Sequence, residues 1–418
     1  MNRLLSIVIA LLISNSVYGT TAKSTVILLS VDGFSYSYLQ KYQPKNLLSF
    51  AKSGVQARLL PVYPSKTFPN HLSIITGNYP VNHGIIHNRF YHPKLVQQYS
   101  LGAGKKNKNW LTAEPFWSVA ENNGIKSAVY FWPESESIGF TQPSYNIPYN
   151  KKTSNKKRVD KLISWLKLPS DQRPNFIASY FSTIDSAGHH YGFDTPELIS
   201  AIHDFDKLFG YFIEKINREI DQPVNIILVS DHGMVPITKE AHIPTNLVLN
   251  NTKKIFKDIK IIYNDTQLLI YFDKSKVPNN VEISIEDQLQ SNKLANKKNY
   301  NIYTKGSYPK HWHFNSDLGI IPDIIIEAKA PSIFTWKKTL TTWNKTLTEF
   351  DGATHGFDPT IDSRLQGIFM ASGSNITKGR ELEPFKNIHI FPLMNMLLGL
   401  QENNKIDGQL SVLKSIVE

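Results

Sequence analysis

Strand-length apolar runs recur along this chain, and several of them end at a polar residue of catalytic type. The runs are Thr25–Val31 before Asp32, Ala128–Trp132 before Pro133, Phe176–Phe181 before Asp185, Val224–Val229 before Asp231 and His232, and Gly367–Ala371. Their apolar residues are continuous rather than alternating, which is typical of strands buried on both faces of a sheet.

Helical patterns lie between these runs. Residues Pro196–Glu219 carry apolar side chains at helical spacing along one stripe. Alternating strands and helices predict an α/β fold, a doubly wound and mostly parallel sheet with helices on both faces. Ligands of such folds bind beyond the carboxyl ends of the strands, which is where the aspartates and His232 fall.

Residues 240–345 break this rhythm, because they are rich in lysine and asparagine and carry short mixed strands. We interpret them as a cap inserted into a single domain that spans residues 23–418. The limits of the insertion stay open, since element boundaries are the least certain part of a sequence-based assignment.

The first residues have the pattern of a secretory signal. Arg3 is followed by a short apolar core, Leu4–Ile13, and by small or tolerated residues at Val17-Tyr18-Gly19. We predict a signal peptide over residues 1–19, with Ala22 as the alternative end and an uncleaved anchor as the alternative interpretation. No later segment is long and apolar enough to span a bilayer, so we expect no transmembrane segment in the mature chain.

The chain has no cysteine. An exported protein of this kind has no disulfides, and we expect a bacterial protein of the periplasm or the medium. Any metal must then be held by His, Asp, Glu or hydroxyl oxygen, which suits zinc in a hydrolytic site. The formal net charge is +11, but the lysines are scattered, so we favour a solvated basic surface and expect no specific nucleic-acid binding.

The segment Pro64–His71 (PSKTFPNH) places a threonine hydroxyl, that of Thr67, just ahead of a predicted helix start. Pro69 suits the first helical position, and Gly77 is a typical helix end. A hydroxyl there lies beside unpaired backbone N–H groups, which could hold an anionic phosphoryl group. The alternative is that Thr67 only caps the helix.

Several residues could bind metal. Asp185 and His189 are four residues apart, so on a helix they share one face. Asp231-His232 and Asp32 directly follow apolar runs, and His355 lies in a glycine-rich loop. Each has an ordinary alternative: a polar loop, an Asp–His hydrogen bond, a turn or an exposed histidine. Together they predict two ion sites of oxygen and imidazole ligands, which can clamp both oxygens of an in-line phosphoryl displacement.

The ordered set of motifs resembles the nucleotide pyrophosphatase/phosphodiesterase family of the alkaline phosphatase superfamily. The matching segments are Val31-Asp32-Gly33, Lys66 to His71, Thr76 to Pro80, His83-Gly84-Ile85, Asn88, Phe131-Trp132-Pro133, Asp185 to His189, Ser230 to Gly233 and His355-Gly356. They run from near residue 24 almost to the end of the chain. The family often has Tyr-Asp-Asn after the last pair, where this chain has Phe357-Asp358-Pro359.

The resemblance implies a role for each matching residue. One Zn²⁺ would be bound by Asp185, His189 and His355. The other would be bound by Asp32, Asp231, His232 and the Thr67 oxygen. Asn88 would donate a hydrogen bond to a phosphoryl oxygen. Phe68 would form one wall of a base-stacking slot, and Tyr149 the opposing wall, with Tyr145 as its competitor.

The resemblance also implies a reaction. Thr67 would attack phosphorus, and a covalent phosphoryl-threonine would then be hydrolysed, releasing nucleoside 5′-monophosphates from nucleotide or other phosphodiester substrates. One alternative is a phosphomonoesterase or phosphonate hydrolase of the same superfamily. The alternative of another class is an exported metal-binding protein without catalysis. The sequence predicts no oligomeric state.

Overall fold

The computed structural model describes residues 24–250, 258–296, 299–315, 319–335, 352–401 and 405–418. The predicted signal peptide over residues 1–19 and its alternative end at Ala22 lie outside the described residues. The same holds for residues 336–345 at the end of the predicted insertion.

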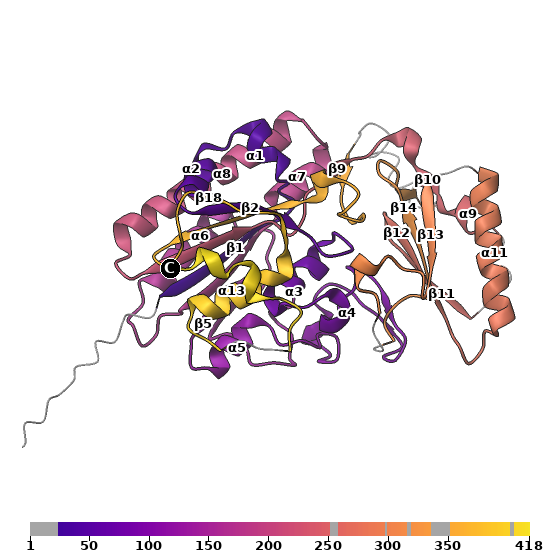
Figure 1. Ribbon diagram of the computed structural model, residues 1–418, viewed down its shortest axis with the longest axis horizontal. Helices are drawn as coiled ribbons and strands as arrows, with labels where there is room; N and C mark the ends of the chain where they lie inside the picture. Colours follow the sequence, from indigo (N-terminus) through magenta and orange to yellow (C-terminus); the bar gives the residue numbers. More distant parts are fainter. Residues whose placement is uncertain (1–23, 251–257, 297–298, 316–318, 336–351, 402–404) are drawn as a thin grey trace, which may run out of the picture.

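Within the described residues, a nine-stranded sheet forms the centre of the molecule, in the order β18-β2-β17-β8-β1-β7-β5-β6 with β19 beside β2 (Figure 1). The strands are β1 (Thr25–Val31), β2 (Val55–Leu60), β5 (Ser127–Tyr130), β6 (Tyr145–Ile147), β7 (Phe176–Phe181), β8 (Val224–Val229), β17 (Gly367–Gly373), β18 (Arg380–Glu381) and β19 (Phe385–Lys386). From β8 to β6 every neighbouring pair is parallel, whereas β17 is antiparallel to β8 and β2. The prediction of a mostly parallel sheet is confirmed.

Helices cover both faces of this sheet (Figure 1). One face carries α1 (Ser37–Tyr42), α2 (Lys45–Lys52), α6 (Asn155–Leu166), α7 (Thr183–Tyr191) and α8 (Pro196–Glu219). The other carries α3 (Thr67–Thr76), α4 (Pro80–His83), α5 (Phe116–Asn122) and α13 (Ile390–Leu397). Successive residues of β1 point into the cores on opposite faces of the sheet. Val26 and Leu28 belong to the core that includes α3, and Ile27 and Leu29 belong to the core that includes α8. This double burial is why the strand has no alternating polar face.

The predicted helix Pro196–Glu219 is present as α8. Two residues fix the start of this helix. The Thr195 hydroxyl caps it by accepting a hydrogen bond from the Leu198 amide at 3.4 Å, and Pro196 occupies the first turn. Its apolar stripe packs into the core below α6 and α2.

A second, antiparallel sheet lies within the range 240–345 that the sequence marks as an insertion. Its order is β11-β12-β14-β13, formed by β11 (Ile259–Tyr263), β12 (Gln267–Phe272), β13 (Tyr300–Thr304) and β14 (Ile324–Ala328). One face, with Leu268 and Ile270, forms a separate core with α9 (Thr245–Val248) and α11 (Asn279–Asn296). The other face, with Leu269 and Tyr271, joins the core of the main sheet. The insertion is therefore packed against the body of the domain.

Three pairs of short strands lie outside these two sheets in the described structure. They are β3 (Tyr91–His92) with β4 (Gln97–Gln98), β9 (Val235–Pro236) with β16 (Ala353–Thr354), and β10 (Ile243–Pro244) with β15 (Phe334–Thr335). No helix among the described ranges combines the length and apolar character that crossing a bilayer requires.

A buried carboxyl group lies where the insertion meets the main body. Glu327 of β14 is 2% exposed, and its Oε1 accepts a hydrogen bond from Gln267 Nε2 at 3.4 Å. Burial, assisted by the charge of Asp358, raises the pKa of Glu327 to about 8. The folded protein thus keeps a proton on Glu327 up to that pH.

The first prediction concerns this group. In the unfolded chain the Glu327 carboxyl loses its proton near its ordinary pKa of 4.5. The free energy of unfolding is therefore greatest in acid and falls as the pH rises from there toward 8. Glu327→Gln should remove this dependence and exceed the wild type at pH ~8.5 by about 4 kcal/mol, with little difference near pH 5. Thermal melting of both proteins across that pH range measures it. A difference that stays constant with pH would contradict the assignment.

Candidate metal centre

Carboxylate side chains follow three neighbouring strands at one edge of the main sheet. Asp32 directly follows β1, and Asp231 follows β8 with one residue between. Asp185 lies in the first turn of α7, the helix after β7. Because β8, β1 and β7 are adjacent and parallel, their carboxyl ends lie together and so do these side chains.

Gly33 permits the close approach of these loops. It has a φ of 70°, and a Cβ atom there would lie 2.9 Å from the Cα of Asp185. Its amide also donates to Asp231 Oδ1 at 3.3 Å. A side chain at this position would therefore push α7 away from the end of β1.

A first group of ligand atoms contains Asp32, Asp231 and His232. The Nε2 atom of His232 lies 3.4 Å from Asp32 Oδ1, 3.1 Å from Asp231 Oδ2 and 3.4 Å from the Thr67 hydroxyl. His232 Nδ1 is 3.0 Å from the Gly233 carbonyl oxygen, to which it donates. This hydrogen bond leaves the lone pair of neutral His232 on Nε2, facing the carboxylates.

A second group contains Asp185, His189 and His355. His189 Nε2 lies 3.3 Å from Asp185 Oδ1, and His355 Nε2 lies 3.1 Å from His189 Nε2 and 3.6 Å from Asp185 Oδ1. His355 Nδ1 donates to the Ser65 carbonyl at 2.8 Å, which places the lone pair of His355 on Nε2. His232 also lies within reach of Asp185 and His355, so the two groups adjoin.

Both groups contain carboxylate oxygens that accept no hydrogen bond. Asp32 Oδ1, Asp185 Oδ1 and Asp231 Oδ2 are buried and have no hydrogen-bond partner. Burial, together with the charge of Asp185, raises the pKa of both Asp32 and Asp231, and burial lowers the pKa of His232 to about 3. A divalent cation would replace the protons that this cluster otherwise needs, and its oxygen and imidazole donors suit zinc.

The predicted nucleophile lies at this cluster. Helix α3 begins at Thr67, so the helix starts two residues earlier than the sequence predicts from Pro69. Lys66 occupies the extended position before the helix, and Pro69 is its third residue. A proline is tolerated there because the first-turn N–H groups have no partner within the helix. The predicted end at Gly77 is confirmed, with a φ of 69°.

The remaining predicted residues surround Thr67 less closely. Asn88 Oδ1 accepts a hydrogen bond from the Phe68 amide at 3.0 Å, which directs the amide group of Asn88 at the start of α3. The Phe68 ring is partly buried and contacts Tyr99 edge-on at 6.4 Å. Tyr149 is 55% exposed, with its ring 5.2 Å from Phe131.

Tyr145, the competitor of Tyr149, faces elsewhere. Its hydroxyl donates to the Gln172 carbonyl, and its ring lies 6.0 Å from Trp165 in the core. Between the two tyrosines, the exposed ring of Tyr149 is the one available to a ligand.

Sequence reasoning missed the side chains that support the ligands. The Tyr180 hydroxyl donates to Asp32 Oδ2, which leaves Asp32 Oδ1 for the cluster. His71 Nδ1 lies 2.8 Å from the Thr67 carbonyl, and its Nε2 is 2.8 Å from the Ser30 hydroxyl. His71 follows Thr67 by four residues on α3, so helical spacing could have placed it below the nucleophile.

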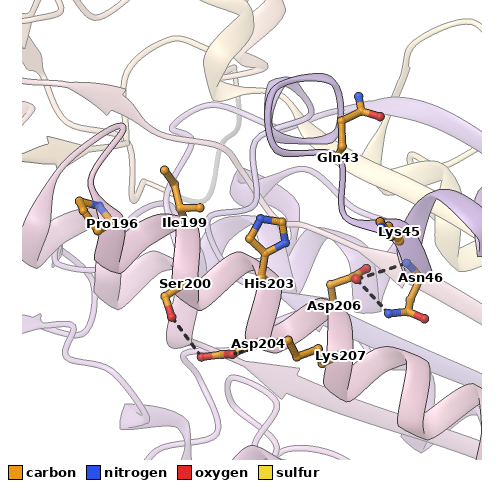
Figure 2. Close-up of a pocket in the computed structure, with 10 residues that line it drawn as sticks. All are labelled: Gln43, Lys45, Asn46, Pro196, Ile199, Ser200, His203, Asp204, Asp206 and Lys207. Carbon is orange, nitrogen blue, oxygen red and sulfur yellow. Dashed lines mark hydrogen bonds and ion pairs between the residues drawn. The ribbon is translucent and has the colours of Figure 1, made fainter.

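A pocket elsewhere on the molecule contains none of these residues in its described lining. It lies between the start of α2 and α8, and Figure 2 shows the side chains that line it. Its volume is about 770 Å³. Its buried carboxylate, Asp206, accepts hydrogen bonds from Asn46 and from the Leu47 amide at 2.9 Å. These bonds satisfy the carboxylate, so the pocket lacks the unpartnered ligand atoms of the metal centre.

Comparison with known families agrees with the arrangement of these residues. Residues 26–358 match the family described as type I phosphodiesterase / nucleotide pyrophosphatase. The chain belongs to this family of hydrolases. The resemblance found in the sequence motifs is thereby confirmed.

Relatives of different length share this similarity. An uncharacterized pyrophosphatase/phosphodiesterase of Schizosaccharomyces pombe is 33% identical over 394 residues, covering 91% of this chain and 79% of the yeast protein. Ectonucleotide pyrophosphatase/phosphodiesterase family member 1 of Homo sapiens is 33% identical over 396 residues, covering 92% of this chain and 41% of the human protein. The chain thus spans less than half the length of that human relative.

Solved structures show the same fold. Murine ectonucleotide pyrophosphatase/phosphodiesterase 5 superposes with a TM-score of 0.82 at 26% identity, covering 94% of this chain and all of the murine one. A threonine-to-alanine variant of that murine protein, described as inactive and in complex with AMP, superposes with a TM-score of 0.81.

The second prediction concerns metal. Chelation should lower the melting temperature, because it leaves the buried carboxylates facing lone pairs, and zinc should restore it; a ligand at ~1,000 times its Kd stabilises by about 4 kcal/mol. His355→Ala should bind about one ion fewer per chain, since it removes a ligand from one group only. Thermal melting and elemental analysis measure both effects.

The matched control is His190→Ala, because His190 is an exposed neighbour of His189 whose ring contacts Tyr191. This variant should bind as much zinc as the wild type. An unchanged melting temperature after chelation, with no bound zinc, would reject the metal centre.

Proposed function

We propose that this protein hydrolyses phosphodiester or pyrophosphate bonds of nucleotides and releases nucleoside 5′-monophosphates through a covalent phosphoryl-threonine. The observation that carries the proposal is the position of the Thr67 hydroxyl. It lies at the first residue of α3 and 3.4 Å from His232 Nε2, beside the buried carboxylates of Asp32 and Asp231. Family membership and the AMP complex of the murine relative support the same substrate class.

Two zinc ions are proposed as cofactors, one held by Asp185, His189 and His355 and the other by Asp32, Asp231, His232 and Thr67. When bound, they supply Lewis-acid stabilisation of the attacking and leaving oxygens and favour ionisation of a hydroxyl. Tyr180 and His71 orient ligands from behind the cluster, as supporting side chains do in metal sites.

The residues of the chain provide the remaining steps. Thr67 Oγ1 gives up its proton to solvent and forms a bond to phosphorus as the bond to the leaving oxygen breaks. The backbone N–H of Thr67 at the start of α3 and the side-chain amide of Asn88 stabilise the negative phosphoryl oxygens. Water then displaces the Thr67 oxygen and regenerates the hydroxyl. Two in-line displacements give retention at phosphorus.

Aromatic side chains support a nucleotide substrate. Phe68 follows the nucleophile directly in the chain. The ring of Tyr149 is exposed and packs edge-on against the ring of Phe131. We assign these two rings to the walls that hold the base, since stacking on aromatic rings is tolerant of base identity. The ring of Tyr180, 6.3 Å from Tyr149, links this wall to the ligand Asp32.

Export to the periplasm or the medium is proposed as well. It rests on the signal pattern of residues 1–19 and on the absence of cysteine from the sequence. A mature N-terminus beginning after Gly19 or Ala22 in a cell-envelope or medium fraction would support it.

The third prediction tests the nucleophile. Thr67→Ala should lower kcat on p-nitrophenyl thymidine 5′-monophosphate by roughly a thousandfold or more, because it removes the attacking oxygen. Zinc content should stay largely intact, since the aspartates and histidines remain. Thr67→Ser, which keeps the hydroxyl, should retain far more activity. A Thr67→Ala protein of near-normal rate would reject the covalent mechanism.

The fourth prediction separates the proposed function from its alternatives. The rate on p-nitrophenyl thymidine 5′-monophosphate should exceed that on p-nitrophenyl phosphate, because only the first offers a base to the aromatic walls. Tyr149→Ala should raise KM for the nucleotide ester with little change for bis(p-nitrophenyl) phosphate; losing one stacking contact costs about 1–3 kcal/mol. Faster hydrolysis of p-nitrophenyl phosphate would favour a phosphomonoesterase. Zinc-loaded protein without turnover on any ester would favour an inert metal-binding protein.

A further inference from the structure

We propose that Asp265, supplied by the insertion, favours diesters over monoesters by neutralising Lys66, the buried cation next to the nucleophile. Asp265 lies in the turn between β11 and β12, and Lys66 directly precedes Thr67. This inference rests on the proposed function and identifies a residue that controls its specificity.

Lys66 and Asp265 form a direct ion pair. Lys66 Nζ lies 2.7 Å from Asp265 Oδ1, and the Lys66 side chain is 7% exposed. The other oxygen, Asp265 Oδ2, accepts a hydrogen bond from the Thr354 hydroxyl at 2.8 Å. Burial raises the pKa of Asp265, but the charge of Lys66 and these hydrogen bonds lower it to about 2 overall. Asp265 is therefore ionised at neutral pH.

The ammonium group lies against the loop of the metal centre. A Cβ atom at Gly356 would fall 2.2 Å from Lys66 Cε and 2.8 Å from its Nζ, and Gly356 has a φ of 112°. The loop is also tied to the residue before Lys66, because Ser65 accepts at its carbonyl from His355 and at its hydroxyl from the Gly356 amide. The cation is thus placed beside His355 and the start of α3.

The charge of the substrate explains what this pairing does. A phosphodiester carries one negative charge, whereas a phosphomonoester carries close to two at neutral pH. An unpaired cation beside the site would favour the second charge of a monoester. Asp265 cancels that cation, so a monoester gains nothing from Lys66. Arg89 follows the predicted site residue Asn88, but its side chain is exposed, so it does not supply a buried cation at the site.

The test removes only the charge of the acid. Asp265→Asn keeps the shape of the side chain and its acceptor for Thr354, but it leaves Lys66 unneutralised. The ratio of kcat/KM on p-nitrophenyl phosphate to that on p-nitrophenyl thymidine 5′-monophosphate should rise roughly tenfold. Adding Lys66→Met should cancel the rise, and Asp265→Glu should restore the wild-type ratio.

A matched control comes from the other end of the same strand. Asp273 follows β12 directly and pairs with Lys276 at 2.9 Å. Asp273→Asn therefore also removes one negative charge from the insertion, but at the opposite end of β12, about 20 Å from Asp265. Its ratio should equal that of the wild type. Titration calorimetry of the zinc-loaded proteins with inorganic phosphate gives a readout without turnover, and Asp265→Asn should bind phosphate more tightly.

The outcomes separate the two proposals. An unchanged ratio, or equal loss of both activities with no gain in phosphate affinity, would show that Asp265 only supports the structure and would overturn the inference. A rise in the ratio that persists without Lys66 would also overturn it. If the wild type hydrolysed neither ester, the proposed function would fail, and the phosphate titration would still decide the role of Asp265.

Discussion

The crowding of lone pairs at the ends of three adjacent strands is the interaction on which the site depends. Asp32, Asp185 and Asp231 lie close to the Nε2 atoms of histidines, and each keeps a buried oxygen that accepts no hydrogen bond. Isolated buried carboxylates cost several kcal/mol each, so the arrangement is stable only with protons or cations among them. The fold holds them there because β8, β1 and β7 are parallel neighbours with apolar side chains on both faces.

Much of this arrangement could be predicted because it is local to a strand and its end. The runs of β1, β7 and β8 are continuous and apolar, and parallel neighbours must bring their carboxyl ends to one edge. Asp32, Asp185, Asp231 and His232 follow from that rule. Thr67 and His355 do not, because no strand end requires them there. The sequence offered both as candidates, and their roles came from the family resemblance; the structure ties them together through Ser65 and through β16 pairing with β9.

The features that the sequence could not predict depend on long-range contacts. Helix α3 starts at Thr67, directly after an extended Lys66, and that lysine is bound by an acid 199 residues away. Tyr180 donates to Asp32 across 148 positions of sequence. Tyr145 and Tyr149 are four residues apart, and contacts distant in sequence distinguish them: Tyr145 packs on Trp165 and donates to Gln172, whereas Tyr149 packs on Phe131. Spacing rules describe one element at a time, so they cannot reach such pairs.

The insertion has a chemical consequence as well as a structural one. One face of its sheet shares the main core, and the turn that begins β12 reaches Lys66 and Thr354 together. A displacement of this sheet would therefore expose a buried ammonium beside the nucleophile and release the loop of His355. Packing of Leu269 and Tyr271 against the main body prevents both, because their burial holds the turn in place. The charge next to Thr67 is thus controlled by hydrophobic contacts on the face of the insertion that packs against the main body.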